Sequence, residues 1–256
     1  MRGDVVGRHC RCVKNASASG RKKKDKHESR RIPGRIDHAR RAGRSGKTSN
    51  VDYLAEQIRA LGFEVVLTRQ PGGSLTAEQI RHVLVGMPHT EEPMTPIAEI
   101  LLYAASRNQV IESVIKPALR EGKVVISDRH YDSSYAYQGW GRGFLEETIA
   151  IERIANQDFQ PDFTLFFDVS FDTALERLQA RKKEFNRLNA EDVDFRQRCF
   201  DGYQERYNAE LHRMYRIDAM QTPEEVRNQV RTFSRNTFLP WLVRHVGKVT
   251  GMVAEG

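Results

Sequence analysis

The chain has 256 residues, of which 39% are hydrophobic and 29% charged, enough to bury one core of the size of a catalytic domain. Its formal net charge of +7 is uneven: residues 1–42 carry 14 Lys and Arg against 4 Asp and Glu, whereas the remainder has a net charge of −3. A slightly acidic body argues against a broad nucleic-acid-binding surface on the folded part.

Cysteine content and hydropathy exclude two further classes of protein. Cys10, Cys12 and Cys199 are too few for a disulfide framework or a complete zinc site. No run of 18 apolar residues indicates a membrane span, and no signal-peptide pattern is present. We therefore expect a soluble, cytoplasmic protein without a membrane partner.

Residues 1–42 allow two interpretations. They can be a genuine basic arm without order, in which RKKKDK (residues 21–26) is typical of a nuclear-localisation or nucleic-acid-binding patch. They can also result from a misassigned start or reading frame, because out-of-frame translation gives aperiodic, arginine-rich sequence that ends abruptly at an intact motif. We favour the second. Apart from two alanines, residues 31–42 offer only Ile32 and Ile36 as apolar side chains, so we expect no buried strand there.

From residue 43 onward helical and strand-like patterns alternate, which is the signature of an α/β fold with a parallel sheet and helices on both faces. Apolar periodicity predicts helices over residues 51–61, 75–85, 97–115, 144–155, 194–213 and 223–233. The third should stop near Pro117. Apolar runs predict strands over residues 63–67, 123–127 and 163–169. We expect the polar residues 177–194 to form a lid and residues 236–256 a C-terminal tail.

A partial phosphate-binding motif precedes the first of these helices. Residues 44–48 supply the second half of G-x-x-x-x-G-K-[ST], in which backbone N–H groups and the lysine bind phosphates and a hydroxyl ligates Mg²⁺. The first half departs from the pattern, because Arg41 occupies the position of the opening glycine. The residues expected to bind ATP are Arg44, Ser45, Gly46, Lys47, Thr48 and Ser49.

VVISDRHYDSSYAYQGWGRG, residues 124–143, is the most informative segment of the chain. A predicted strand ends there in Asp128 and Arg129. Ligands of open α/β sheets bind beyond the carboxyl ends of the strands, so an acid and an arginine stand where anion chemistry occurs.

Three segments together resemble the thymidylate kinase family over roughly residues 43–235. TRQPGG (68–73) is similar to the family's TREPGG, residues 128–143 to its DR[YH]-x-x-S-x-x-AYQG-x-x-RG, and ILLYAASRNQ (100–109) to its aromatic-x-x-x-Arg-x-Gln helix. The resemblance implies a P-loop NTPase fold with three layers and a short lid. It also implies a homodimer that transfers the γ-phosphoryl group of ATP to dTMP with the help of Mg²⁺, giving dTDP and ADP.

The resemblance assigns the phosphate chemistry to a small set of residues. Lys47 would contact the β- and γ-phosphates, while Thr48 and Asp128 would hold Mg²⁺. Arg129 and Arg69 would bind the dTMP phosphate, Arg129 through the planar fork of its guanidinium. The remaining loop residue assigned to the substrate is Pro71.

The nucleoside is assigned to a second set. Tyr103 would stack on thymine, and Arg107, one helical turn later, would donate to its carbonyl edge. Ser134, Tyr137 and Gln138 would line the nucleoside side of the pocket, where a tyrosine can exclude a 2′-hydroxyl.

The source of the catalytic cation stays open. One branch of the family uses an arginine at the position of Arg44 and the other an arginine in the lid, for which Arg177, Arg181 and Arg187 are candidates. Our hypothesis is Arg44. Two positions depart from the family pattern: Gln70 replaces a glutamate, and Asn186 replaces an acid often found before the lid arginine.

Two alternative functions are weighed against the dTMP kinase. The chain can be a kinase for another nucleotide or deoxynucleoside, which the motifs do not exclude. It can also be a catalytically silent nucleotide- or nucleic-acid-binding homologue, which Arg41 and the basic arm would favour.

Overall fold

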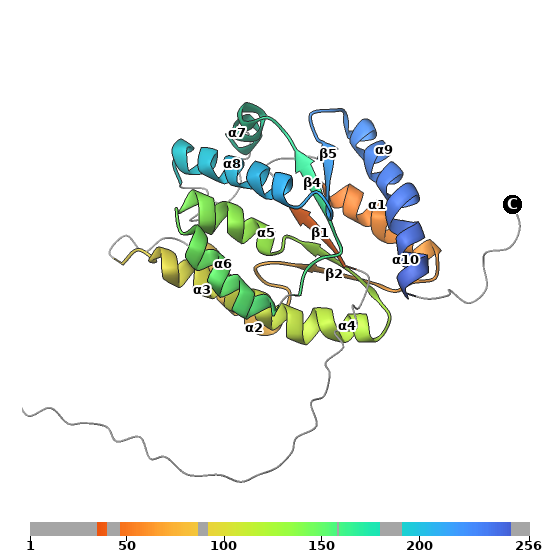
Figure 1. The fold of residues 1–256 in the computed structure, drawn as a ribbon, viewed down its shortest axis with the longest axis horizontal. Coiled ribbons are helices and arrows are strands. Elements are labelled where there is room, and N and C mark those ends of the chain that lie inside the picture. The colour runs from red at the N-terminus through yellow and green to blue at the C-terminus, as the bar shows by residue number, and fades with distance from the viewer. Residues whose placement is uncertain (1–34, 40–46, 87–91, 158, 180–190, 247–256) are drawn as a thin grey trace, which may run out of the picture. The chain divides into compact units, whose positions relative to one another are not determined.

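The computed structural model describes residues 35–39, 47–86, 92–157, 159–179 and 191–246 (Figure 1). All of them lie in the second of the two units into which the chain divides, Ile32–Gly256. They form a parallel sheet with the strand order β2-β3-β1-β4-β5. The strands are β1 (Arg35–Ala39), β2 (Val65–Arg69), β3 (Val124–Asp128), β4 (Phe163–Asp168) and β5 (Met214–Asp218).

Helices cover both faces of this sheet (Figure 1). The chain before residue 142 forms α1 (Lys47–Ala60), α2 (Leu75–Val85), α3 (Pro96–Val110), η1 (Ile111–Ile115), α4 (Lys116–Arg120), α5 (Tyr131–Ser134) and η2 (Tyr135–Gly141). The rest forms α6 (Leu145–Asn156), α7 (Phe171–Gln179), α8 (Val193–Ala209), α9 (Pro223–Phe233), η4 (Ser234–Phe238) and α10 (Leu239–Val246). The segments η1, η2 and η4 are π-helical.

Alternate residues of the central strands belong to different cores. Val124 and Ile126 of β3 pack with α1, α9 and α10, whereas Val125 packs with α2, α3, η1 and α4. On the second face, Phe166 of β4 joins a smaller cluster with α8 and η2. Strands buried on both faces carry continuous apolar runs, which is why the predictions of β3 and β4 are confirmed.

The expectation that residues 31–42 contain no strand is wrong. Strand β1 lies between β3 and β4, with Ile36 opposite Ile126 on one side and Phe163 on the other. Backbone N–H and C=O groups make this pairing, so a strand can occupy the slot without the side-chain pattern of a buried strand. An apolarity criterion misses such a strand.

Three helix boundaries also differ from the expectation. The helix expected to stop near Pro117 continues through the π-helical η1 into α4, and Pro117 stands directly after the segment in which the regular α-helical ladder is interrupted. The helix expected to end at Arg213 ends at Ala209. The segment 236–246 is helical rather than a tail, and residues 247–256 lie outside the described residues.

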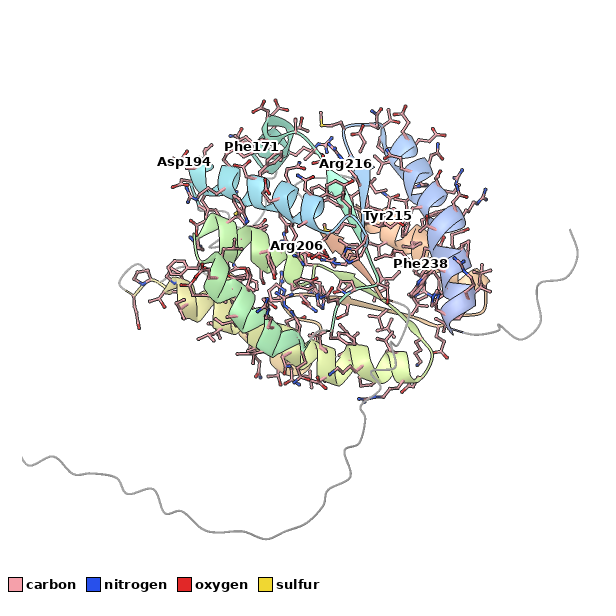
Figure 2. The ribbon with its side chains drawn as sticks, viewed as in Figure 1. Phe171, Asp194, Arg206, Tyr215, Arg216 and Phe238 are labelled. Carbon is pink, nitrogen blue, oxygen red and sulfur yellow. The ribbon has the colours of Figure 1, made fainter. Side chains whose placement is uncertain are left out.

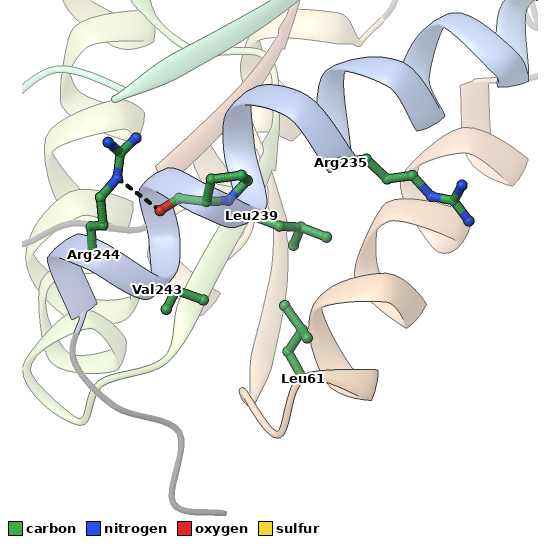
Figure 3. Close-up of a pocket in the computed structure, with 6 residues that line it drawn as sticks. Leu61, Arg235, Leu239, Val243 and Arg244 are labelled. Carbon is green, nitrogen blue, oxygen red and sulfur yellow. Dashed lines mark hydrogen bonds between the residues drawn. The ribbon is translucent and has the colours of Figure 1, made fainter. Parts of the chain in front are cut away.

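The C-terminal helices contribute to the main core. Phe238 and Leu242 are completely buried, and the ring of Phe163 in β4 contacts Phe238 and Trp241 with centroid distances of 5.8 and 5.0 Å. The outer side of α10 forms an apolar groove with the residue that follows α1, Leu61 (Figure 3). Because α1 starts at the carboxyl edge of the sheet and Leu61 follows its other end, this groove lies away from Asp128.

None of the helices in the described part of the chain is long and apolar enough to cross a membrane.

The burial of α10 gives a direct test of the domain boundary. We expect Leu242→Ala to lower the free energy of unfolding by about 2–5 kcal/mol, because it removes a completely buried side chain. Val243→Ala, on the exposed side of the same helix, should change it by less than about 1 kcal/mol. Urea denaturation measures both, and equal effects would show that α10 does not belong to the core.

Candidate functional site

The acid and the two arginines assigned to phosphate chemistry meet at the carboxyl ends of β2 and β3. Arg69 and Asp128 are partners in the strand register, and the Asp128 carbonyl accepts a hydrogen bond from Gln70 N at 2.9 Å. Strand β1 ends beside them, with His38 opposite Asp128, and the following helix α1 begins at Lys47. The strand order therefore brings these residues to the edge where the first helix starts.

Arg129 has an unusual backbone conformation and a supported side chain. Its φ of 76° lies in the left-handed region, which residues with a Cβ rarely adopt and which is often found at functional sites. The guanidinium lies over the ring of Tyr137, 5.2 Å from its centroid. Its NH1 group is 3.5 Å from both Ser133 Oγ and Tyr203 OH. The guanidinium is thus held by one aromatic ring and two hydroxyl groups, and none of these three groups carries a charge.

The loop that begins at Arg69 is fixed by Glu78 of α2. Arg69 donates to the Glu78 carboxylate at 2.9–3.3 Å, and Gly73 N donates to it at 2.8 Å. The bonds from Arg69 and Gly73 lower the pKa of Glu78 from its usual value. A Cβ at Gly73, where φ is 93°, would lie only 2.9 Å from the Arg69 carbonyl, so the turn requires glycine. The Pro71 carbonyl accepts a bond from Arg81 at 2.9 Å.

Arg107 is the central charge of the nucleoside side, and it is only 2% exposed. Its Nε and NH2 groups donate to Glu152 of α6 at 2.9 and 3.1 Å. NH1 donates to Gln70 Oε1, and NH2 also donates to Ser134 Oγ. These contacts engage four of the five N–H groups of the guanidinium. Sequence reasoning missed Glu152, because nothing local marks a partner 45 residues away.

Gln138 is held by a second buried acid that the sequence reasoning missed. Its Nε2 donates to Glu99 Oε1 at 2.6 Å, and both residues are 1% exposed. Arg142 donates to the other Glu99 oxygen at 3.2 Å. Glu99 could have been identified from the sequence. It stands within the apolar run of α3, and a charged residue in a buried helix needs a partner. Tyr103 lies between Glu99 and Arg107, one turn from each.

A cluster around Asp132 anchors the segment that follows Arg129. Asp132 is completely buried and accepts bonds from Arg213 at 2.6 and 2.9 Å and from Arg206 at 2.8 Å. Arg206, labelled on α8 in Figure 2, also lies over the ring of Tyr135 at 4.2 Å. Arg213 donates to Thr164 of β4 as well, at 2.9 Å. The cluster connects α5 to α8 and to the sheet.

The other predicted site residues are only partly described. Arg44, Ser45, Gly46, Arg181 and Arg187 lie outside the described residues, as do the side chains of Lys47, Thr48 and Ser49, whose backbone forms the first turn of α1. Arg177 belongs to helix α7, and its NH1 donates to the Ala219 carbonyl at 3.1 Å. Its assignment to a lid stays a prediction, because a position near the C-terminal end of α7 does not test it.

The parallel sheet, with polar residues at the carboxyl ends of its strands, defines a ligand-binding α/β protein. A sequence profile described as Thymidylate kinase matches residues 43–230. The thymidylate kinase of Pseudomonas fluorescens (strain Pf0-1) is 42% identical over 193 residues, covering 75% of this chain and 90% of the relative. That of Mycoplasma capricolum subsp. capricolum is 40% identical over 187 residues, covering 72% and 87%. The chain belongs to the thymidylate kinase family, which confirms the resemblance carried by its three motifs.

The contribution of the Asp132 cluster to the free energy of unfolding can be measured by substitution. We expect Asp132→Asn to lower the free energy of unfolding by about 3–5 kcal/mol at pH 7, because it removes the buried carboxylate that Arg206 and Arg213 share and leaves them only Glu210. Asp172→Asn, on the exposed surface of α7, should change it by less than about 0.5 kcal/mol. Guanidinium chloride denaturation would contradict the role of the cluster if both variants behaved alike.

The same variant should change the response to acid. Burial would raise the pKa of Asp132, but the neighbouring Arg213 and Arg206 outweigh it and hold this pKa below its usual value. Its contribution to stability is therefore complete above about pH 4 and is lost as the pH falls further. Asp132→Asn should lack this part of the acid-induced loss, which denaturation curves between about pH 5 and pH 2 would measure.

Proposed function

We propose that this chain transfers the γ-phosphoryl group of ATP to dTMP, giving dTDP and ADP. The observation that carries the proposal is the meeting of Asp128, Arg129 and Arg69 at the sheet edge where α1 begins, in a member of the thymidylate kinase family. The fold we propose is the three-layer P-loop NTPase sandwich with a lid after α7. The resemblance covers residues 43–235, and we extend the proposed kinase domain to residues 35–246, because β1 lies within the sheet and Leu242 of α10 within the core.

The ATP side would use the start of α1. Its first-turn N–H groups have no partners within the helix and present positive partial charge to phosphates. Lys47 would add a cation there, with Ser45, Gly46 and Ser49 around the phosphates. Arg44 is the cation we assign to the transferring group, which needs charge neutralisation and in-line placement more than covalent chemistry.

Mg²⁺ fits this edge of the sheet. Mg²⁺ in kinases is usually held by one or two carboxylates together with substrate phosphates, rather than by a cage of protein ligands. The described residues contain no cluster of three potential ligands, and Asp128 offers one half-buried carboxylate at the strand end. Thr48 and Asp128 would hold the ion, which would neutralise charge on the phosphates.

The dTMP side would lie between the TRQPGG loop, α3 and the α5–η2 segment. Arg129 and Arg69 would bind the phosphate, beside Pro71. Tyr103 would stack on the base, and the remaining N–H of Arg107 NH1 would reach a base carbonyl. Ser134, Tyr137 and Gln138 would close the nucleoside side, with the Tyr137 ring held by Arg129 and by an edge contact with Tyr203 at 6.1 Å.

We also propose a homodimer. Three neighbouring helices, α2, α3 and α6, expose large apolar side chains to solvent, namely Leu75, Val83, Ile97, Leu101 and Ile154. Exposed apolar side chains that gather on neighbouring helices are typical of an interaction site between protein chains.

The function is tested by a substrate comparison with the full chain. A coupled assay of ADP release should show the highest kcat/KM with dTMP among dTMP, dUMP, dCMP and thymidine. Absence of a preference for dTMP would point to a kinase for another nucleotide. Absence of any turnover, together with salt-dependent DNA binding that disappears when the five basic residues of RKKKDK become alanine, would identify a silent binding protein.

A single substitution tests the phosphate role of Arg129. Arg129→Lys keeps the charge but loses the planar fork, so we expect kcat/KM for dTMP to fall about tenfold to a hundredfold. The Kd of thymidine, which lacks the phosphate, should stay within about twofold of the wild-type value. Arg120→Lys, exposed at the end of α4, is the matched control and should change neither quantity. Equal losses for dTMP and thymidine would contradict the assignment.

A further inference from the structure

We propose that Glu99 is a positioning residue that sets the orientation of the Gln138 side-chain amide, so that Gln138 offers the base a hydrogen-bond acceptor. A pyrimidine with an N3–H beside a 4-carbonyl would thereby be selected over one with an N3 acceptor beside a 4-amino group. The inference rests on the proposed function, because it concerns the base of the same acceptor nucleotide.

The orientation follows from the chemistry of the buried contact. The two ends of a glutamine amide have nearly the same shape, and only the hydrogen-bond network distinguishes them. Glu99 forms an ion pair with Arg142, and a carboxylate only accepts hydrogen bonds. The end of Gln138 that faces Glu99 must therefore be its nitrogen, at 2.6 Å. The carbonyl oxygen is left at the opposite end.

The reversed amide is disfavoured by the same contact. It would place the Gln138 carbonyl against the Glu99 carboxylate, which brings two buried acceptors together without a proton between them. Because both side chains are 1% exposed, water does not compensate for the loss. Glu99 thus excludes the wrong orientation as well as supporting the right one, which is how specificity against a competitor is built.

The arrangement of the two helical segments places Gln138 beside the proposed base platform. Helix α3 presents Glu99, Tyr103 and Arg107 at successive turns. Across from it, Gln138 contacts Glu99 and Ser134 contacts Arg107, so these two contacts bracket Tyr103. A base stacked on Tyr103 would therefore meet an acceptor, Gln138 Oε1, on one side and a donor, the remaining N–H of Arg107, on the other.

The donor and acceptor match one class of pyrimidine. Thymine and uracil carry a carbonyl at position 4 and an N–H at N3, whereas cytosine carries an amino group and a bare nitrogen there. The free N–H of Arg107 would pair with the 4-carbonyl, and Gln138 Oε1 with N3–H. In cytosine the 4-amino group would face the N–H of Arg107, so that two donors meet. Its bare N3 would face Gln138 Oε1, so that two acceptors meet.

The test compares binding of dTMP, dUMP and dCMP by isothermal titration calorimetry, which does not depend on phosphoryl transfer. In Glu99→Gln either end of the new amide can face Gln138, so both orientations of Gln138 become available. We expect the ratio of Kd for dCMP to Kd for dTMP to fall about tenfold, the effect of one hydrogen bond. Values for dUMP should follow those for dTMP.

A double variant separates orientation from folding. In Glu99→Gln with Gln138→Glu, the carboxylate at position 138 is an acceptor at both ends. The amide at position 99 can donate to it and still accept from Arg142. The dCMP to dTMP ratio should return to within about threefold of the wild-type value. Glu191→Gln removes the other acid bonded to Arg142 and leaves Glu99 with its counter-charge, so it should lower the thermal unfolding midpoint with the ratio unchanged.

Each outcome decides the proposal. A Glu99→Gln variant that unfolds at a lower temperature but keeps the wild-type ratio would show a purely structural role and overturn it, as would a double variant without rescue. Wild-type protein that binds dTMP no tighter than dCMP would overturn it even if the kinase is active. Wild-type protein that prefers dTMP in binding but transfers no phosphoryl group would refute the proposed activity, while the same titrations still decide the role of Glu99.

Discussion

The buried carboxylate of Asp132 is the constraint on which the site depends. It lies four residues after Asp128, and its bonds to Arg206 and Arg213 connect α5 to α8 and to the residue preceding β5. Arg213 also bonds to Thr164, so the segment leaving β3 is tied to β4. A buried charge without its partner is strongly unfavourable, so these elements must assemble together. Arg129, with its left-handed backbone, lies three residues before this anchor.

The nucleoside side uses buried charge in the same way. Glu152 of α6 neutralises the charge of Arg107, and Glu99 of α3 accepts a hydrogen bond from Gln138. Such pairs contribute little net stability compared with apolar packing, but they fix which N–H and C=O groups remain for a ligand. The recognition groups are therefore oriented before a nucleotide binds, which reduces the entropy lost on binding.

The sequence predicted those elements and site residues that a local pattern marks. It did not predict those that depend on residues far away along the chain. β3 and β4 carry continuous apolar runs, and the apolar periodicity of residues 75–85 predicted α2. The motifs marked Asp128 and Arg129. By contrast, β1 depends on backbone pairing with two strands, and α10 on packing against Phe163. Asp132 and Arg213 are 81 residues apart, and no local pattern specifies that pairing.

The replacement of the family's glutamate by Gln70 can be understood from the same charge arrangement. Gln70 Oε1 accepts a bond from Arg107, whose charge is already balanced by Glu152. A glutamate at this position would place two carboxylates around one guanidinium and leave a net negative charge beside a site proposed for an anionic nucleotide. The amide supplies the acceptor that Arg107 needs without that charge. Its cost is a buried Nε2 group that lacks a hydrogen-bond partner in the described part of the chain, which a neutral amide tolerates far better than a charge would.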